Sequence, residues 1–119
     1  MRDYIYKVEN ISTERAKMLK NLALEYKSLK NILIEDSFNR ERPPRICELR
    51  QIAIIENALE EVSGGNDFLY KAMRDIVSGE VTLYEAERKY YGYSKSYYTK
   101  KRREFYVILN RNFEEALAS

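Results

Sequence analysis

Apolar side chains recur at intervals of three or four residues near the start of the chain, the spacing that places them on one helix face. The first such row consists of Leu19, Leu22, Tyr26, Leu29 and Leu33. Ser12 precedes the row as a capping residue, with Ile11 placed as a hydrophobic staple, so we expect a long helix to begin here. The row spans barely two heptads. It therefore favours packing within the chain, and a dimeric coiled coil through residues 12–33 remains the alternative.

The polar stretch 35–45 ends in Pro43-Pro44 and predicts a linker, because proline disfavours helix immediately before it. A second helix is expected from about Arg45 to Val62, ended by Gly64-Gly65. Its predicted buried row is Ile46, Leu49, Ile52, Ile55, Leu59 and Val62.

A third helix is expected after a cap at Asn66 or Asp67, and Gly79 ends it. Its predicted apolar face is Leu69, Ala72, Met73, Ile76 and Val77.

Two further helices are predicted between residues 82 and 109. Thr82 and Glu85 have the spacing of a capping box, which starts a short helix that runs to about Tyr91. Gly92 permits a turn, and Ser94 caps a longer helix. A step of 100° per residue places one apolar face on this last helix, formed by Tyr98, Phe105, Ile108 and Leu109. Tyr106 and Val107 fall off this face, where they would cover the N-terminal helix or form a subunit contact.

These patterns predict an all-α fold, a small bundle of about five helices with a C-terminal helix-turn-helix. The 119 residues suffice for one core, and we found no strand alternation of useful length. We expect residues 1–44 to form an N-terminal helix and linker used for packing or oligomerisation. Residues 45–119 would form the functional domain.

Positive charge is concentrated on the last two helices. No acidic residue lies between Arg88 and Arg103, a stretch with seven cations, whereas the whole chain carries a formal net charge of only +2. Such a cluster is typical of a phosphate-binding surface, and a helix-turn-helix places its second helix in the DNA major groove. We expect the polar side of that helix to face the bases through Lys95, Ser96, Thr99, Lys100 and Arg103.

A second set of side chains is expected to contact the DNA backbone: Arg88, Lys89, Tyr93, Ser94, Tyr97, Lys101 and Arg102. Six of the eleven tyrosines lie between Tyr84 and Tyr98. Tyr90 and Tyr98 fall on inward positions, while Tyr91, Tyr93 and Tyr97 fit either phosphate contact or surface packing.

The residue types argue against an enzyme. The chain has no histidine, one cysteine (Cys47) and no GxxxxGK[ST] loop, so we expect no catalytic residue, no metal and no cofactor. No apolar run approaches the roughly 20 residues of a membrane span, and no signal-like leader is present. We therefore expect a cytoplasmic protein that does not contact a membrane.

The segment TLYEAERKYYGYSKSYYTKKRREFYVIL, after a helix reading ICELRQIAIIENALEEV, resembles the RinA/ArpU-type phage regulators of late genes. Their DNA-binding segment is similar to the last region of bacterial sigma factors. The shared features are the Gly92-Tyr93-Ser94 corner and the basic helix from Lys100 to Arg103, within residues 46–115. The resemblance implies a phage or prophage activator in the bacterial host cytoplasm, which binds DNA upstream of packaging or lysis genes.

The leading hypothesis is a sequence-specific regulator of transcription that binds double-stranded DNA, with RNA polymerase as a further candidate partner. Homodimerisation through residues 12–33 or through the end of the last helix is also open. One alternative is an all-helical protein-interaction module whose basic helix meets an acidic partner and modulates or inhibits transcription. Another is a DNA-recognition protein like a phage terminase small subunit.

Overall fold

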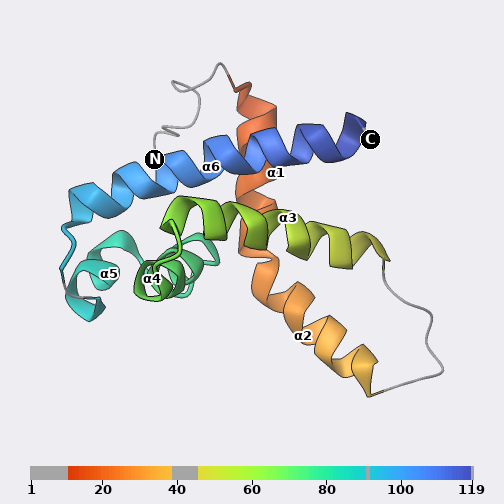
Figure 1. Cartoon of the computed structure of the whole chain (residues 1–119), viewed down its shortest axis with the longest axis horizontal. Helices are drawn as coiled ribbons and strands as arrows, with labels where there is room; N and C mark the ends of the chain where they lie inside the picture. Colours follow the sequence, from red (N-terminus) through yellow and green to blue (C-terminus); the bar gives the residue numbers. More distant parts are fainter. Residues whose placement is uncertain (1–10, 39–45, 91, 119) are drawn as a thin grey trace.

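The computed structural model describes residues 11–38, 46–90 and 92–118, and within these ranges the chain is helical without strands (Figure 1). The predicted all-α fold is confirmed. The helices are α1 (Thr13–Leu24), α2 (Tyr26–Ser37), α3 (Ile46–Ser63), α4 (Asp67–Val77), α5 (Leu83–Lys89) and α6 (Lys95–Ala118).

Side chains that cap helix ends fix where four of the helices begin. The Ser12 hydroxyl accepts from the backbone N–H of Arg15 at 3.1 Å, and the Asn66 side chain accepts from that of Leu69 at 3.0 Å. The remaining two caps, at Thr82 and Ser94, start α5 and α6. Each cap satisfies a backbone donor that the first helical turn leaves without a partner, and each was predicted from the local sequence.

The long helix predicted after Ser12 is divided into α1 and α2 at Glu25. The backbone N–H of Glu25 is shared between the carbonyls of Asn21 and Leu22, at 3.1 and 3.2 Å. No proline or glycine marks this position, so the division of the helix could not be expected from the local sequence. The predicted linker also begins too early, because α2 continues to Ser37. The Pro43-Pro44 part of that linker lies outside the described residues.

The core forms where α3 and α6 run side by side in opposite directions, with α1 crossing α6 (Figure 1). Ile55 and Leu59 of α3 and Phe105 of α6 are fully buried. α4 adds Met73 and α1 adds Leu19, both also at 0% exposure. The row predicted on the first helix, from Leu19 to Leu29, is therefore buried within the chain.

The structure decides between the two alternatives left for Tyr106 and corrects one predicted face. Tyr106 is buried on α6, which contacts α1 as well as α3, so its burial agrees with packing against the N-terminal helix rather than with a subunit contact. Conversely, Ile46 and Leu49 were predicted in the buried row of α3, yet they are 58% and 49% exposed. No helix among the described residues is both long and apolar enough to span a membrane.

Candidate nucleic-acid interface

α5 and the start of α6 form a helix-turn-helix at one end of the molecule (Figure 1). The Thr82 backbone N–H donates to the Glu85 carboxylate at 2.9 Å, and the Glu85 N–H donates back to the Thr82 hydroxyl at 3.1 Å. The first of these bonds is the main reason why the pKa of Glu85 lies below its ordinary value. Gly92 in the turn has φ +97°, a conformation that L side chains rarely adopt.

Several contacts fix α5 against α6. Ala86 is fully buried in α5, and the Tyr98 hydroxyl on α6 donates to the backbone carbonyl of Tyr90 at 3.3 Å. The Glu87 carboxylate accepts from the backbone N–H of Lys95 at 2.7 Å, at the N-terminus of α6. This last contact joins residues eight positions apart across a turn, so helical periodicity could not have found it.

The predicted base-facing side chains lie on the outer side of the first turns of α6. Lys95, Ser96, Lys100 and Arg103 are exposed. Thr99 is half-buried, and its hydroxyl donates to the carbonyl of Lys95 at 2.9 Å. That hydroxyl keeps its oxygen as an acceptor, so the face offers both donors and acceptors to a ligand.

The predicted phosphate contacts differ in how much they are engaged within the chain. Arg88, Lys89 and Ser94 are exposed, whereas Tyr93, Tyr97, Lys101 and Arg102 are half-buried. The Lys101 ammonium lies 3.2 Å from the Glu104 carboxylate and 5.7 Å from the centre of the Tyr97 ring. The charge of Lys101 is thus partly balanced by a neighbour on α6.

Aromatic rings support the turn. Tyr93 and Tyr97 stack with their centroids 4.3 Å apart and an interplanar angle of 11°. Phe68 of α4 meets the Tyr90 ring edge-on at 5.6 Å. Tyr98 is fully buried, and burial is the main cause that raises its pKa to about 12. These contacts favour the packing role for Tyr93 and Tyr97 and leave their hydroxyl groups as the candidate phosphate donors. Tyr91 lies outside the described residues.

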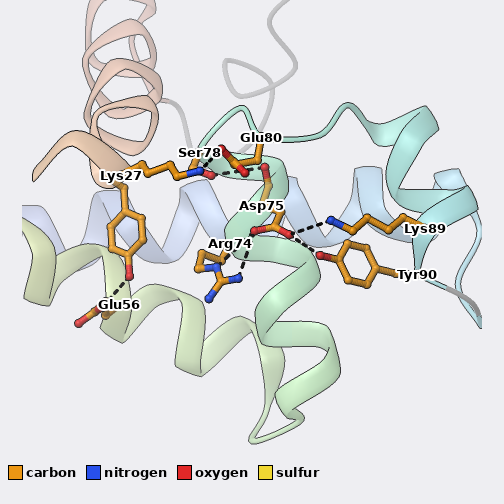
Figure 2. Close-up of polar contacts among 9 residues, drawn as sticks. Lys27, Glu56, Arg74, Asp75, Ser78, Glu80, Lys89 and Tyr90 are labelled. Atoms are coloured by element: carbon orange, nitrogen blue, oxygen red, sulfur yellow. Dashed lines mark hydrogen bonds and ion pairs between the residues drawn. The ribbon is translucent and has the colours of Figure 1, made fainter. Parts of the chain in front are cut away.

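A buried carboxylate on α4 anchors the end of α5, as Figure 2 shows. Asp75 is 8% exposed and accepts from the Tyr90 hydroxyl and, at 3.3 Å, from the Arg74 guanidinium. Lys89 lies 3.9 Å from the same carboxylate. Burial, followed by the hydrogen bond to Asp75, raises the pKa of Tyr90 to about 12. Asp75 was not among the residues predicted from the sequence, although its place three residues after Ala72 and next to Ile76 puts it beside the apolar face of α4.

A second group of polar contacts attaches α2 to the rest of the molecule (Figure 2). The Tyr26 hydroxyl donates to the Glu56 carboxylate of α3 at 2.6 Å, and Lys30 lies 3.1 Å from that carboxylate. Lys27 pairs with Glu80 in the α4–α5 connection. A cavity of about 220 Å³ adjoins these residues, but its cations Lys27, Lys30 and Arg74 all pair with carboxylates. Among the described residues no group of three potential ligands could hold a metal.

A groove of about 430 Å³ runs along α6 beside the exposed cations. Val107 and Ile108 contribute apolar surface to it, and Glu61 and Val62 come from the end of α3. Lys100 and Arg103 line the same groove, so part of the predicted DNA face borders an apolar surface.

No family model matches the chain, and no curated protein or solved structure matches it either. The resemblance of residues 46–115 to RinA/ArpU-type regulators therefore stays a prediction.

Proposed function

We propose that this protein is a transcriptional regulator that binds double-stranded DNA in a sequence-specific manner. The observation that carries the proposal is the two-sided character of α6. Tyr98 and Phe105 are fully buried on one side, while Lys100 and Arg103 are exposed on the other. A helix anchored in this way presents a rigid polar surface, and the major groove of B-DNA is wide enough to admit an α-helix.

The protein would make two kinds of contact with DNA, one to base edges and one to the sugar-phosphate backbone. Lys100 or Arg103 would reach guanine edges, where a good bidentate contact discriminates between bases by about 1–3 kcal/mol. Arg88 and Lys89, exposed at the end of α5, would hold the sugar-phosphate backbone and set the register. The RinA/ArpU resemblance supports the narrower proposal of a phage or prophage late-gene activator that acts with RNA polymerase.

The test is removal of both groove-facing cations. We expect Lys100→Ala/Arg103→Ala to weaken binding to a pool of genomic DNA fragments and to flatten the slope of log K against log salt by up to about two units, because two counterion-releasing contacts are lost. Fluorescence anisotropy over a salt series measures both quantities. Selection of bound fragments from the same pool would then identify the sequence that is read.

A matched control removes the same charge elsewhere. Lys17→Ala/Lys20→Ala lies on α1 and has the same effect on net charge, so we expect it to leave the salt slope close to that of the unmodified chain. An unchanged affinity and slope in the α6 variant would end the proposal. An equal loss of affinity in the α1 variant would show that DNA is attracted only by the net charge of the protein.

A second candidate is a protein-interaction module that binds an acidic partner. The groove beside Val107 and Ile108 favours it, because its apolar surface borders Lys100 and Arg103. This candidate predicts no retardation of duplex DNA in a gel at low salt. It further predicts that Val107→Asp prevents retention of the acidic partner, whereas DNA binding would depend on the cations of α5 and α6 and not on Val107.

A further inference from the structure

The diverging ends of α2 and α3 leave an apolar surface uncovered. We call this surface the α2–α3 face, and its principal side chains are Ile34, Phe38, Ile46 and Leu49. Their exposed fractions are 54%, 84%, 58% and 49%, respectively. A cavity of about 360 Å³ opens between the two helices and is lined by Leu33 and Ile52 in addition to Ile34 and Leu49. Figure 1 shows that the end of α2 and the start of α3 diverge.

The sequence pattern indicates that another protein element contacts this face. The apolar row of α3 continues without interruption from Ile46 to Val62. Ile52 and Ile55 within the row are no more than 5% exposed, but the row extends toward Ile46 beyond the last helix that covers it. Such a periodic row ordinarily marks a surface that another element contacts.

The area of the face suits a protein–protein contact. The four residues together expose on the order of 500 Å², which is more than half of the roughly 800 Å² that each partner buries in a standard interface. Lys30 and Ala53 at the cavity wall would add to the contact.

The charges that border the face are mixed in sign. Lys30 and Glu35 lie on α2, and Glu48, Arg50 and Glu56 lie on α3. A strongly acidic or basic partner would require one sign to dominate. A surface with both signs around an apolar centre is instead suited to a two-fold contact, in which each residue pair occurs twice.

We propose that a second copy of this chain covers the α2–α3 face. The diverging ends of α2 and α3 lie away from the start of α6 along the molecule, whose longest dimension is 47 Å, so self-association leaves the exposed cations at the start of α6 accessible (Figure 1). This step does not depend on DNA binding. Only its consequence, a dimer that reads two separated half-sites, rests on the proposed function.

The test measures the mass of the full chain by light scattering and sedimentation, without DNA, from about 1 to 100 µM, because self-association depends on protein concentration. We expect a dimer that dissociates on dilution. In Ile46→Asp/Leu49→Asp we expect the dissociation constant to rise at least about tenfold, since two carboxylates would be buried in the contact. Aspartate suits the first turn of α3, so circular dichroism should show an unchanged helix content.

Two further variants locate the contact. Tyr84→Asp, on exposed α5, should dimerise like the unmodified chain. Leu117→Asp tests the end of α6, and loss of the dimer there but not in the α3 variant would overturn the proposal. A monomeric unmodified chain over the whole range would also overturn it and leave the face to a different protein. Should the double variant lose helicity, Ile46→Asp alone repeats the test at a position already more than half exposed.

Discussion

The two ends of this molecule expose opposite kinds of surface. At the α5–α6 end, the apolar row of the last helix is buried and the exposed face is polar and basic, with Lys100 and Arg103 at its centre. At the α2–α3 end, Lys30 pairs with Glu56 of the same chain and the exposed face is apolar, with Ile46 and Leu49 at its edge. The difference shows that one bundle can present a surface suited to a charged ligand and another suited to a second protein, with little overlap.

The prediction with the largest expected effect tests whether the apolar row of α3 is buried at Ile55 and exposed at Leu49. We expect Ile55→Ala to lower the free energy of unfolding by about 2–5 kcal/mol, because it leaves a cavity in the core. Leu49→Ala on the same helix should cost about 1 kcal/mol or less, because half of that side chain is already exposed. Urea unfolding at high dilution, where any dimer has dissociated, measures both. Equal losses would show that Leu49 is as well covered as Ile55 and would remove the contrast between the two ends.

Local sequence predicted those features of the fold that neighbouring residues determine. The cap at Ser12, the capping box of Thr82 with Glu85, and the turn at Gly92 each involve residues within one helical turn or one backbone conformation. The buried face of α6 through Tyr98 and Phe105 follows from periodicity alone. For the same reason, the outer position of the basic side chains of α6 followed once its apolar side had been identified.

The remaining features depend on residues far apart in the sequence. The hydrophobic pattern does not show how far the neighbouring helices extend along α3 and α6. Ile46 was therefore assigned to the core and Tyr106 was not. The Asp75–Tyr90 contact joins two helices across a connection, and Glu87 contacts the start of α6 only because the turn closes. Periodicity identifies which side of a helix is apolar, but packing between helices decides which part of that side is covered.

An intermediate effect compares two tyrosine–carboxylate pairs, one at each end. Tyr90→Phe removes the bond to Asp75 and Tyr26→Phe removes the bond to Glu56. Each should cost about 1 kcal/mol of stability at neutral pH, as a typical hydrogen bond does. Only Tyr90→Phe should also weaken DNA binding, by up to about fivefold, the factor that corresponds to that same energy when all of it holds the start of α6 in place. Urea unfolding measures the effect on stability and anisotropy measures the effect on DNA binding. Equal DNA affinity in both variants would show that Asp75 does not position the start of α6.

The pH dependence of stability follows from the same pair. The pKa of Tyr90 in the folded chain is about 12, above the ordinary value of 10.0, because burial and the Asp75 carboxylate disfavour the phenolate. Its contribution to stability is therefore complete below pH 10 and is lost as the pH rises toward 12. The stability difference between Tyr90→Phe and the unmodified chain should accordingly narrow over this window. A difference that widened there would mean that the phenolate is favoured in the folded state.

The smallest effect concerns the carboxylate at the N-terminus of α6. Glu87→Gln keeps an oxygen that can accept from the Lys95 N–H, so the start of the helix is preserved while one negative charge is removed. If phosphates approach this end, affinity for duplex DNA should rise about twofold at low salt, since two unit charges about 8 Å apart in water interact by about 0.5 kcal/mol. The gain should disappear at high salt, where screening removes it.

Glu14→Gln on α1 makes the same change in net charge and should leave affinity unchanged. Equal gains in both variants would show a response to net charge alone. No gain in Glu87→Gln would mean that the duplex meets α6 farther along, near Lys100 and Arg103, and that the turn itself stays clear of the backbone.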